Sequence, residues 1–544
     1  MRSGAEGDEF DATRDAMGRR LPEVETAIDN LVKRLVDQIA RLPPAELLKR
    51  AWWELALAFS GLSEANSDID RSLALRMVDY VQSLIAAAPR APIQAADVEA
   101  EEWDALKATV RELFERVTME YQICRSANLR LQTADVDLHL EEFRFRAEVL
   151  WTNVRGKRYH VHEMQALLDV LAPHSDELVK LFGIDAQGLV DEVDKLLIKL
   201  THGLQETMLG FDNFRDHTLD RFTQLAEAAP EADIEGLRRQ VFEDPDLAKE
   251  RETVMANLFG LGLFDIAANT NLPARLVDEL SWSPAEDIEF LAPGPFSGWP
   301  LRVWPTMKRP FIRLDGRAYC FDVFSLFDNL YRVLQRAIFR LDPSYRPTWN
   351  ERQKIVSEKL PLKYLTKLLP GATSFAPVYY RWKPSAAAAQ WYEADGLIIF
   401  GDHLLIIEVK AGAFTYTSPA TDLPAHIASL EALVSSPVQQ AGRFLDYLES
   451  APEVVIADAD HNEIGRIRRD QFRHVTICAV TLDAFSDLTA RAQHLKGVGI
   501  ELGKRPVWVV SVDDLRAYAD LFTSPLTFLH FVEQRMRARR SPIW

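Results

Sequence analysis

Residues 393–412, EADGLIIFGDHLLIIEVKAG, constrain the possible fold more than any other part of this sequence. The stretch holds two apolar runs of strand-like composition, and each run ends in charged residues. Gly401 and Asp402 lie between the runs and are residue types that favour a two-residue hairpin turn. In that hairpin Asp395 lies opposite Glu408, because each step away from the turn pairs the next position on both strands. The sequence therefore predicts two carboxylates on one face of a sheet, about 5 Å apart at Cβ.

A lysine belongs to the same predicted cluster. Lys410 follows Glu408 by two positions, so it emerges on the same face of the sheet, opposite Glu393. Two carboxylates that face each other on an apolar hairpin repel and lose hydration, which favours a compensating divalent cation. Oxygen ligands suit Mg²⁺, and the ammonium of Lys410 would polarise an attacking water. The alternative is a structural salt bridge from Lys410 to Glu393 or Glu408.

Helical periodicity marks the front of the chain. Apolar residues recur every three or four positions from Leu21 to Ile39, which predicts an amphipathic helix that ends before Pro43. Similar patterns follow with no repeat of fixed period, so we expect several long antiparallel helices. We assign residues 1–245 to an all-α scaffold or oligomerisation region, through which the chain would bind a second copy of itself or a partner protein.

Proline and glycine interrupt residues 246–344, which we assign to a connecting module. Asp315 and Gly316 between two alternating runs predict a β-hairpin. The segment LPARLVDEL, residues 272–280, is expected to be a small packing helix rather than half of a helix-turn-helix motif.

Helices and strands alternate over residues 345–544, which is typical of an α/β domain with a mixed central sheet. The predicted fold is therefore multidomain, with an all-α N-terminal region followed by this α/β domain. The expected elements are a helix over 349–369, strands over 374–382, 393–400 and 403–410, a helix over 436–449, strands over 474–480 and 506–512, and a last helix that ends in Arg535, Arg537, Arg539 and Arg540.

Charge is unevenly distributed along the chain. The formal net charge is −18, yet residues 345–544 hold 23 Lys and Arg against 22 Asp and Glu, which leaves 40 against 59 for residues 1–344. A near-neutral domain can still present a basic groove to nucleic acid. No apolar run approaches the length of a membrane span, and the acidic start is unlike a targeting peptide. We therefore expect a cytoplasmic protein that does not contact a membrane.

The segments EADGLII and LLIIEVKAG together resemble the core motif of the PD-(D/E)xK nuclease superfamily. The resemblance covers residues 345–544 and implies a restriction-endonuclease-like fold, with a helix, a three-stranded antiparallel meander, a second helix and a further strand that pairs in parallel. The elements expected from the residues follow that order. Ala394 stands where the family often has a proline before the aspartate, which is a frequent departure.

This resemblance also implies roles for individual residues. Asp395 and Glu408 would be the metal ligands, assisted by the carbonyl of Val409, and Lys410 would be the catalytic lysine. The metal would be Mg²⁺, with Mn²⁺ as a possible substitute.

Two helices are expected to add polar groups to the same site. The family's first helix usually offers a glutamate, for which Glu358 suits the distance to the first strand better than Glu351. In related branches the second helix carries a glutamine near a basic residue, and QQAGR supplies Gln440, or else Gln439, with Arg443. The alternative is that these are ordinary polar residues on helix surfaces.

These inferences combine into one functional hypothesis. The chain is expected to be a metal-dependent phosphodiesterase that acts on nucleic acid, with DNA as the expected polymer and defence against foreign DNA implied only by the resemblance. A non-catalytic nucleic-acid-binding or assembly protein with the same fold is one alternative, and an RNA-directed nuclease is another. The motifs of phosphate loops and serine hydrolases are absent from the sequence, and Cys124, Cys320 and Cys478 form no CxxC pair.

Overall fold

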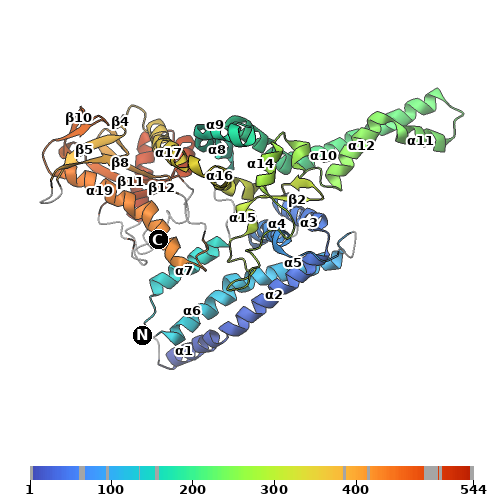
Figure 1. Ribbon diagram of the computed structural model, residues 1–544, viewed down its shortest axis with the longest axis horizontal. Helices are drawn as coiled ribbons and strands as arrows, with labels where there is room; N and C mark the ends of the chain where they lie inside the picture. The colour runs from blue at the N-terminus through green and yellow to red at the C-terminus, as the bar shows by residue number, and fades with distance from the viewer. Residues whose placement is uncertain are drawn as a thin grey trace.

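The computed structural model describes residues 4–60, 68–92, 97–133, 135–152, 159–383, 388–412, 417–482, 500, 505 and 507–538. Helices make up the first half of the chain, and mixed and antiparallel sheets lie towards its C-terminus (Figure 1). This arrangement confirms a helical front followed by a region with a mixed sheet. In the described part of the chain, no helix combines the length and apolar character needed to span a membrane.

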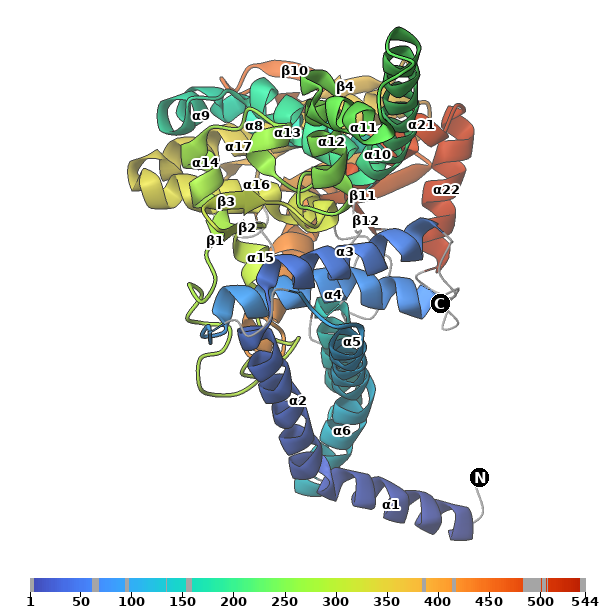
Figure 2. The ribbon, with the colours of Figure 1, turned by 90° about the vertical axis from the view of Figure 1, so that its right-hand side faces the viewer.

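The front of the molecule is built from amphipathic helices. They are α1 (Gly4–Arg19), α2 (Leu21–Arg41), α3 (Pro44–Ser60), α4 (Asp68–Ala87), α5 (Ala100–Glu115), α6 (Tyr121–Gln132), α7 (Leu138–Trp151), α8 (Glu163–Leu171) and α9 (Ser175–Phe182), with the short turns η1 (Arg116–Glu120), η2 (His160–His162) and η3 (Ala172–His174). The predicted helix is confirmed as α2, which buries Ile28, Leu35 and Ile39 along one stripe. That stripe packs against α5 and α6 (Figure 2).

A long helical arm extends from this front (Figure 1). It consists of α10 (Ala186–Ala228), α11 (Ile234–Glu243) and α12 (Pro245–Leu258). Asp185 caps α10 by accepting a hydrogen bond from the N–H of Gly188 at 2.7 Å. The helices α11 and α12 fold back along the distal part of α10, so the arm is a helical hairpin rather than a single free helix.

The middle of the chain joins the helical front to the sheets. Its elements are α13 (Ile266–Asn269), α14 (Ala274–Glu279), β1 (Ser281–Trp282), α15 (Pro305–Lys308), β2 (Phe311–Leu314), β3 (Arg317–Tyr319), α16 (Val323–Leu341) and η4 (Pro343–Tyr345). The predicted hairpin is confirmed, because Leu314 pairs with Arg317 across Asp315 and Gly316, whose φ angles are 49° and 81°. The helix α14 is short and buries Leu276, as expected of a packing helix.

Two sheets form the C-terminal region. The elements are α17 (Arg346–Leu368), β4 (Thr373–Phe375), β5 (Val378–Trp382), β6 (Gln390–Ala394), β7 (Gly396–Phe400), β8 (His403–Lys410), α18 (Leu423–Leu430), η5 (Glu431–Ser435), α19 (Ser436–Glu449), β9 (Val454–Ala457), β10 (Glu463–Ile467), η6 (Arg469–Gln471), β11 (His474–Thr481), β12 (Val507–Ser511), α21 (Val512–Leu521) and α22 (Pro525–Ala538). One sheet has the strand order β12-β11-β8-β7-β4, and the other has the order β10-β9-β5-β6.

The register of the β7–β8 hairpin is the one predicted. Phe400 pairs with His403 and Gly396 with Ile407 around the Gly401-Asp402 turn. The strand β4 extends the hairpin on one side in antiparallel orientation, and β11 pairs with β8 in parallel on the other side. The C-terminal region therefore contains a three-stranded antiparallel meander followed by parallel strands.

Two strands expected to be continuous are each divided between the sheets. The predicted strand over 374–382 is β4 and β5, separated by Pro377, which has no N–H for a ladder hydrogen bond. The predicted strand over 393–400 is β6 and β7, separated by Asp395. Because β6 pairs with β5 while β7 pairs with β8, the chain bends at Asp395. The strands β9 and β10 were not predicted.

The five-stranded sheet is covered on both faces. Leu405 and Ile407 of β8 enter a core shared with α17, α21 and α22, whereas Leu404 and Ile406 face the opposite way, into a core with α19. The first core continues through the middle of the chain into the N-terminal helices, so the three assigned ranges share one apolar interior. The three cysteines are buried, as expected. Arg537 pairs with Glu533, and the predicted basic residues Arg539 and Arg540 lie outside the described residues.

Candidate functional site

Asp395 lies at the bend between β6 and β7, and a backbone contact fixes its carboxylate. The N–H of Val409 donates a hydrogen bond to Oδ2 of Asp395 at 2.6 Å. Because Val409 belongs to β8, this bond ties the bend to the strand that carries Glu408. Burial raises the pKa of Asp395 above its ordinary value, while the hydrogen bond from Val409 and the charge of Lys410 oppose that rise.

Glu408 is almost completely buried, with a relative exposure of 2%. It alternates with Leu404 and Ile406, so it leaves the sheet on the face covered by α19. Among the described residues, its Oε1 has no hydrogen-bond partner. Burial raises the pKa of Glu408 well above its ordinary value, and the charge of Asp395 adds to the shift. An isolated buried carboxylate of this kind is costly unless it is protonated or compensated by a cation.

Lys410 ends β8 on the same face as Glu408 and contacts the covering helix. Its Nζ donates a hydrogen bond to Oε1 of Gln440 at 2.6 Å. Gln439 instead donates to the hydroxyl of Ser435 at 3.3 Å, about one turn earlier. Of the two glutamines considered in the sequence, Gln440 is therefore the one that holds the lysine.

Glu358 of α17 is the helix glutamate that lies near Asp395. Burial raises the pKa of Glu358, and the negative charge of Asp395 adds to the rise. A second lysine neutralises this side of the site, because Nζ of Lys354 lies 3.6 Å from Oε1 of Glu358 and 3.5 Å from Oε1 of Glu393. Glu351, the alternative on the same helix, is exposed.

The predicted position of Glu393 opposite Lys410 is wrong. Glu393 lies on β6, which leaves the ladder with β8 and pairs with β5, so that its partner position is Tyr379. The cation beside Glu393 is Lys354, whereas Lys410 donates its hydrogen bond to Gln440 of α19. Lys354 was not singled out in the sequence, although its spacing of four residues from Glu358 on a helix is a signal for an ion pair.

Arg443 and two tyrosines complete the surroundings of the buried carboxylate. The guanidinium of Arg443 lies over the ring of Tyr392, 5.5 Å from its centroid, and its charge opposes the rise in the pKa of Glu408. Burial raises the pKa of Tyr380, and the charge of Glu408 adds to the shift. The tyrosines lie in strand-forming runs, where the sequence offers no signal that separates a site residue from a core residue.

Within this site, Asp395 and Glu408 are the two residues best suited to bind a divalent cation. Asp395 is held in place by Val409, and Glu408 has a buried oxygen with no partner among the described residues. In the described part of the chain, no cluster of three or more His, Cys, Asp and Glu side chains is arranged to hold a metal alone. A metal here would therefore need water, backbone or phosphate oxygens for its remaining positions, as Mg²⁺ commonly does.

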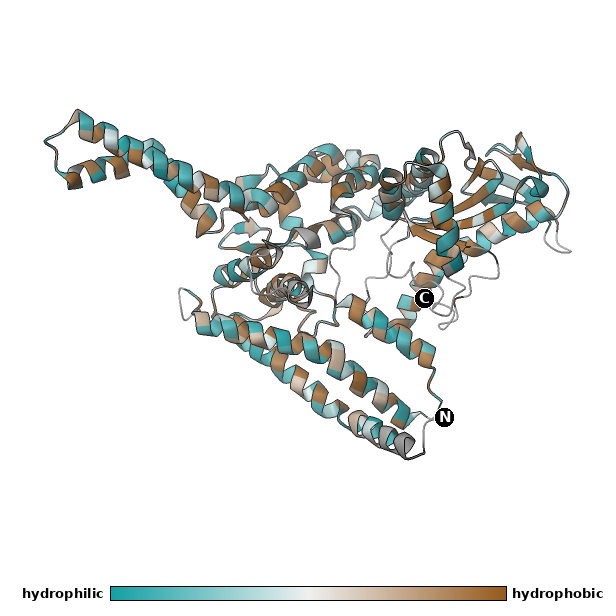
Figure 3. Ribbon diagram, turned by 180° about the vertical axis from the view of Figure 1, so that it is seen from behind, coloured by the Kyte–Doolittle hydropathy of each residue, from teal (hydrophilic) through white to brown (hydrophobic). Residues whose placement is uncertain are grey.

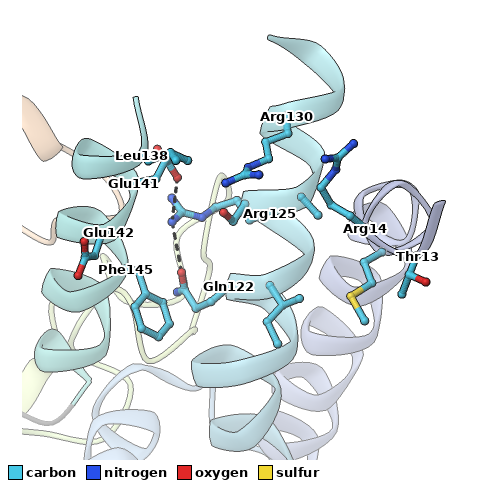
Figure 4. Close-up of a pocket in the computed structure, with 13 residues that line it drawn as sticks. Thr13, Arg14, Gln122, Arg125, Arg130, Leu138, Glu141, Glu142 and Phe145 are labelled. Carbon is cyan, nitrogen blue, oxygen red and sulfur yellow. Dashed lines mark hydrogen bonds and ion pairs between the residues drawn. The ribbon is translucent and has the colours of Figure 1, made fainter. Parts of the chain in front are cut away.

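A cavity of about 550 Å³ lies in a different part of the molecule, between α1, α6 and α7 (Figure 4). Arg125 is its central charged group, and it lies 3.6 Å from Glu141 and donates to Gln122 at 3.3 Å. The carboxylates of the candidate site do not line this cavity. It was not predicted from the sequence, and its charged residues also form ion pairs outside the lining, such as that of Arg125 with Glu148 at 3.2 Å.

Comparison with known proteins identifies no relative of this chain. No family model, no curated protein and no solved structure matches this chain.

Proposed function

We propose that this chain is a metal-dependent nuclease that hydrolyses phosphodiester bonds, with DNA as its substrate. The observation that carries the proposal is the buried carboxylate of Glu408, which feels the charge of Asp395 and has one oxygen with no hydrogen-bond partner among the described residues. The ammonium of Lys410 lies nearby. It donates a hydrogen bond to Gln440 and forms no ion pair with either carboxylate. Two carboxylates can hold a metal ion, and a positioned ammonium can stabilise the charge that develops on a phosphoryl group.

Each residue has a distinct task in this proposal. Asp395 and Glu408 would hold Mg²⁺ or Mn²⁺, with the carbonyl of Val409 as a further ligand. When bound, the metal would stabilise charge on the phosphoryl group and acidify an attacking water. Lys410 would orient that water or donate to a phosphate oxygen, and Gln440 would hold the ammonium in position. Glu358 would bind water on the α17 side of the site.

The order of the elements supports the same proposal. A helix, α17, precedes the β4-β7-β8 meander, and a second helix, α19, leads towards β11, which pairs with β8 in parallel. This order is the one implied by the resemblance to the PD-(D/E)xK superfamily. A restriction-endonuclease-like fold is therefore part of the proposal, and so is a role in defence against foreign DNA.

The helical arm supports a further part of the proposal, which is assembly through the N-terminal region. Hydrophobic residues lie among polar ones along the arm (Figure 3). Met208, Phe211 and Leu219 of α10 are exposed, as are Ile234 and Phe242 of α11. Apolar side chains exposed on a projecting hairpin are typical of a surface that binds another protein or a second copy.

A cleavage assay tests the proposed activity. Purified full-length protein is incubated with labelled single- and double-stranded DNA and RNA, in Mg²⁺, Mn²⁺ or EDTA. We expect cleavage of DNA that EDTA abolishes, and a loss of about a hundredfold or more in Asp395→Asn and Lys410→Met, because each change removes a group that stabilises developing charge.

Two matched variants control for nonspecific damage. Asp402→Asn changes an aspartate at the other end of the same hairpin, and Glu351→Gln changes an exposed glutamate on α17. Both should cleave like the wild type. Wild-type protein that cuts none of the polymers with either metal would contradict the proposal and favour a non-catalytic binding protein. Cleavage of RNA alone would favour the RNA-directed alternative.

A further inference from the structure

We infer that the outer face of the β5–β6 hairpin is a binding platform for the unpaired bases of a nucleic-acid strand that runs into the carboxylate site. The inference rests on the proposed function and adds to it a class of substrate, single-stranded nucleic acid. Its centre is Trp391, whose relative exposure is 39% although it lies in a strand.

Strand alternation gives this hairpin one buried and one open face. Tyr380 and Tyr392 point into the core beneath α19. Trp391 is the residue before Tyr392, so it points away from that core, and its partner position across the hairpin is Arg381. In the described part of the sheet, β6 is an edge strand, so one side of the platform is open to a ligand.

An aromatic stack is already formed on the open face. The ring of Trp391 lies parallel to that of His461, with centroids 3.9 Å apart and an interplanar angle of 2°. Tyr379 meets His461 edge-on, with centroids 5.9 Å apart. His461 has a φ angle of 66° in a turn closed by its N–H bond to the carbonyl of Asp458. The indole is thus supported on one face by a fixed ring, and its exposed surface can take a further ring.

Two cations flank this stack on the β5 side, while one carboxylate, Asp458, lies near His461 in the turn. Arg381 on β5 and Lys383, the residue that follows β5, are exposed, and neither makes an ion pair with a described residue. The acidic group nearest to the stack along β6, Glu393, is compensated by Lys354 at 3.5 Å. Two cations beside an aromatic stack are the combination by which proteins bind single strands without reading their sequence.

The platform leads directly to the proposed site. Trp391 and Glu393 alternate along β6, and Asp395 follows this strand at the bend, so the four residue steps from Trp391 to Asp395 span at most about 13 Å. At about 3.4 Å per stacked nucleotide, that distance corresponds to no more than about four nucleotides. A strand whose base stacks on Trp391 would therefore place a nearby phosphate at the bend that carries Asp395.

The aromatic contact selects an unpaired strand over a duplex. The bases of a duplex are stacked on one another, so an indole reaches their faces only after unstacking, which costs free energy. Every unpaired base offers a free face, so the platform should tolerate any sequence.

Binding measurements with the full-length protein test the inference. Fluorescence anisotropy is recorded in EDTA, which prevents metal-dependent cleavage, with labelled oligonucleotides of about 20 nucleotides as single-stranded DNA, single-stranded RNA and blunt duplex. We expect single strands to bind more tightly than the duplex. Trp391→Ala should weaken single-strand binding by about 5- to 150-fold, and Trp391→Phe should retain most of the affinity.

A matched aromatic control separates the platform from a general surface effect. Phe145 on α7 has a similar relative exposure of 43%, and Phe145→Ala should bind like the wild type. Arg381→Ala should reduce the slope of log affinity against log salt concentration by about 0.7, the value for one phosphate contact with a single strand. Thermal melts of each variant verify that the chain is folded.

The outcomes distinguish this inference from the proposed activity. Unchanged affinity in folded Trp391→Ala, equal affinity for duplex, or no binding by the wild type would each overturn the platform, whether or not the protein cleaves DNA. Binding that depends on Trp391 in a protein that cleaves no polymer would leave the platform standing and overturn the nuclease.

Discussion

Two buried groups of charged residues in the C-terminal region differ in how their charges are compensated. Arg516 on α21 is 4% exposed, and it lies 2.6 Å from Asp513 and 3.0 Å from Asp169. Its Nε also donates to the hydroxyl of Tyr364 at 2.8 Å. Glu408 on β8 is 2% exposed, yet it makes no ion pair with a described residue.

The difference separates a structural group from a functional one. Asp169 belongs to the helical front, Tyr364 to α17 and Arg516 to α21. The first group therefore joins three parts of the molecule through an ion pair and a hydrogen bond between its own side chains. In the second group, the buried negative charge of Glu408 is removed by a proton or balanced by a cation from solution. A buried charge without an ion-pair partner in the described chain is a mark of binding and catalytic sites, whereas buried ion pairs such as those of Arg516 join parts of the fold.

Removal of Arg516 should have the largest effect on stability. Arg516→Ala leaves Asp513 and Asp169 without their buried guanidinium, which should lower the free energy of unfolding by about 3–5 kcal/mol. Urea denaturation followed by tryptophan fluorescence measures the loss, with the exposed Arg381→Ala as a control that should change stability little. If the free energy of unfolding fell by less than about 1 kcal/mol, the Arg516 network would not be a main contributor to stability.

Glu408→Gln should have a smaller effect of the opposite sign. Because the pKa of Glu408 is raised by folding, the folded chain keeps the carboxyl proton between the unfolded and the folded pKa, where the unfolded chain has released it. Its contribution to stability is therefore complete below the unfolded pKa and is lost as the pH rises through the folded pKa. In EDTA the variant should lose this pH dependence and exceed the wild type by about 1 kcal/mol at alkaline pH.

Denaturation curves in EDTA across a pH series check this expectation, with Glu351→Gln as the matched exposed change on α17. If Glu408→Gln proved less stable than the wild type at alkaline pH, Glu408 would belong with the structural group, and the contrast between the two regions would fail.

Local chemistry explains why part of the fold was predictable. The Gly401-Asp402 turn fixes the register of β7 and β8, because residues that favour a tight turn leave few alternative pairings for the flanking runs. The same holds for the Asp315-Gly316 hairpin and for α2, whose apolar spacing identifies its buried face. In each case the signal and the structure lie within a short stretch of chain.

The bend at Asp395 could not be predicted in that way. The run from Glu393 to Phe400 suits either one strand or two, and the choice depends on β5, a partner that is itself separated from β4 at Pro377. Strand preference depends on the neighbouring strands more than on the residue itself. Consequently the predicted neighbour of Lys410 was wrong, and the ladder between β7 and β8 ends at Gly396 and Ile407, one position before Asp395 and Glu408.

The remaining polar groups of the site depend on contacts between elements. Lys354 meets Glu393 only because α17 packs beside the bend, and Arg516 meets Asp169 across more than three hundred positions of sequence. Without a packed structure, such residues look like any charged residue on a helix. The two glutamines of α19 were likewise indistinguishable until Lys410 was placed beside Gln440.

Metal binding tests the central claim, that Asp395 and Glu408 form an incomplete site which a divalent cation completes. Isothermal titration calorimetry of metal-free full-length protein with Mn²⁺ requires neither substrate nor turnover. We expect saturable binding at the carboxylate pair, kept in Asp402→Asn and lost in Asp395→Asn and Glu408→Gln. Wild-type protein that binds no Mn²⁺, or variants that bind it as the wild type does, would contradict the claim.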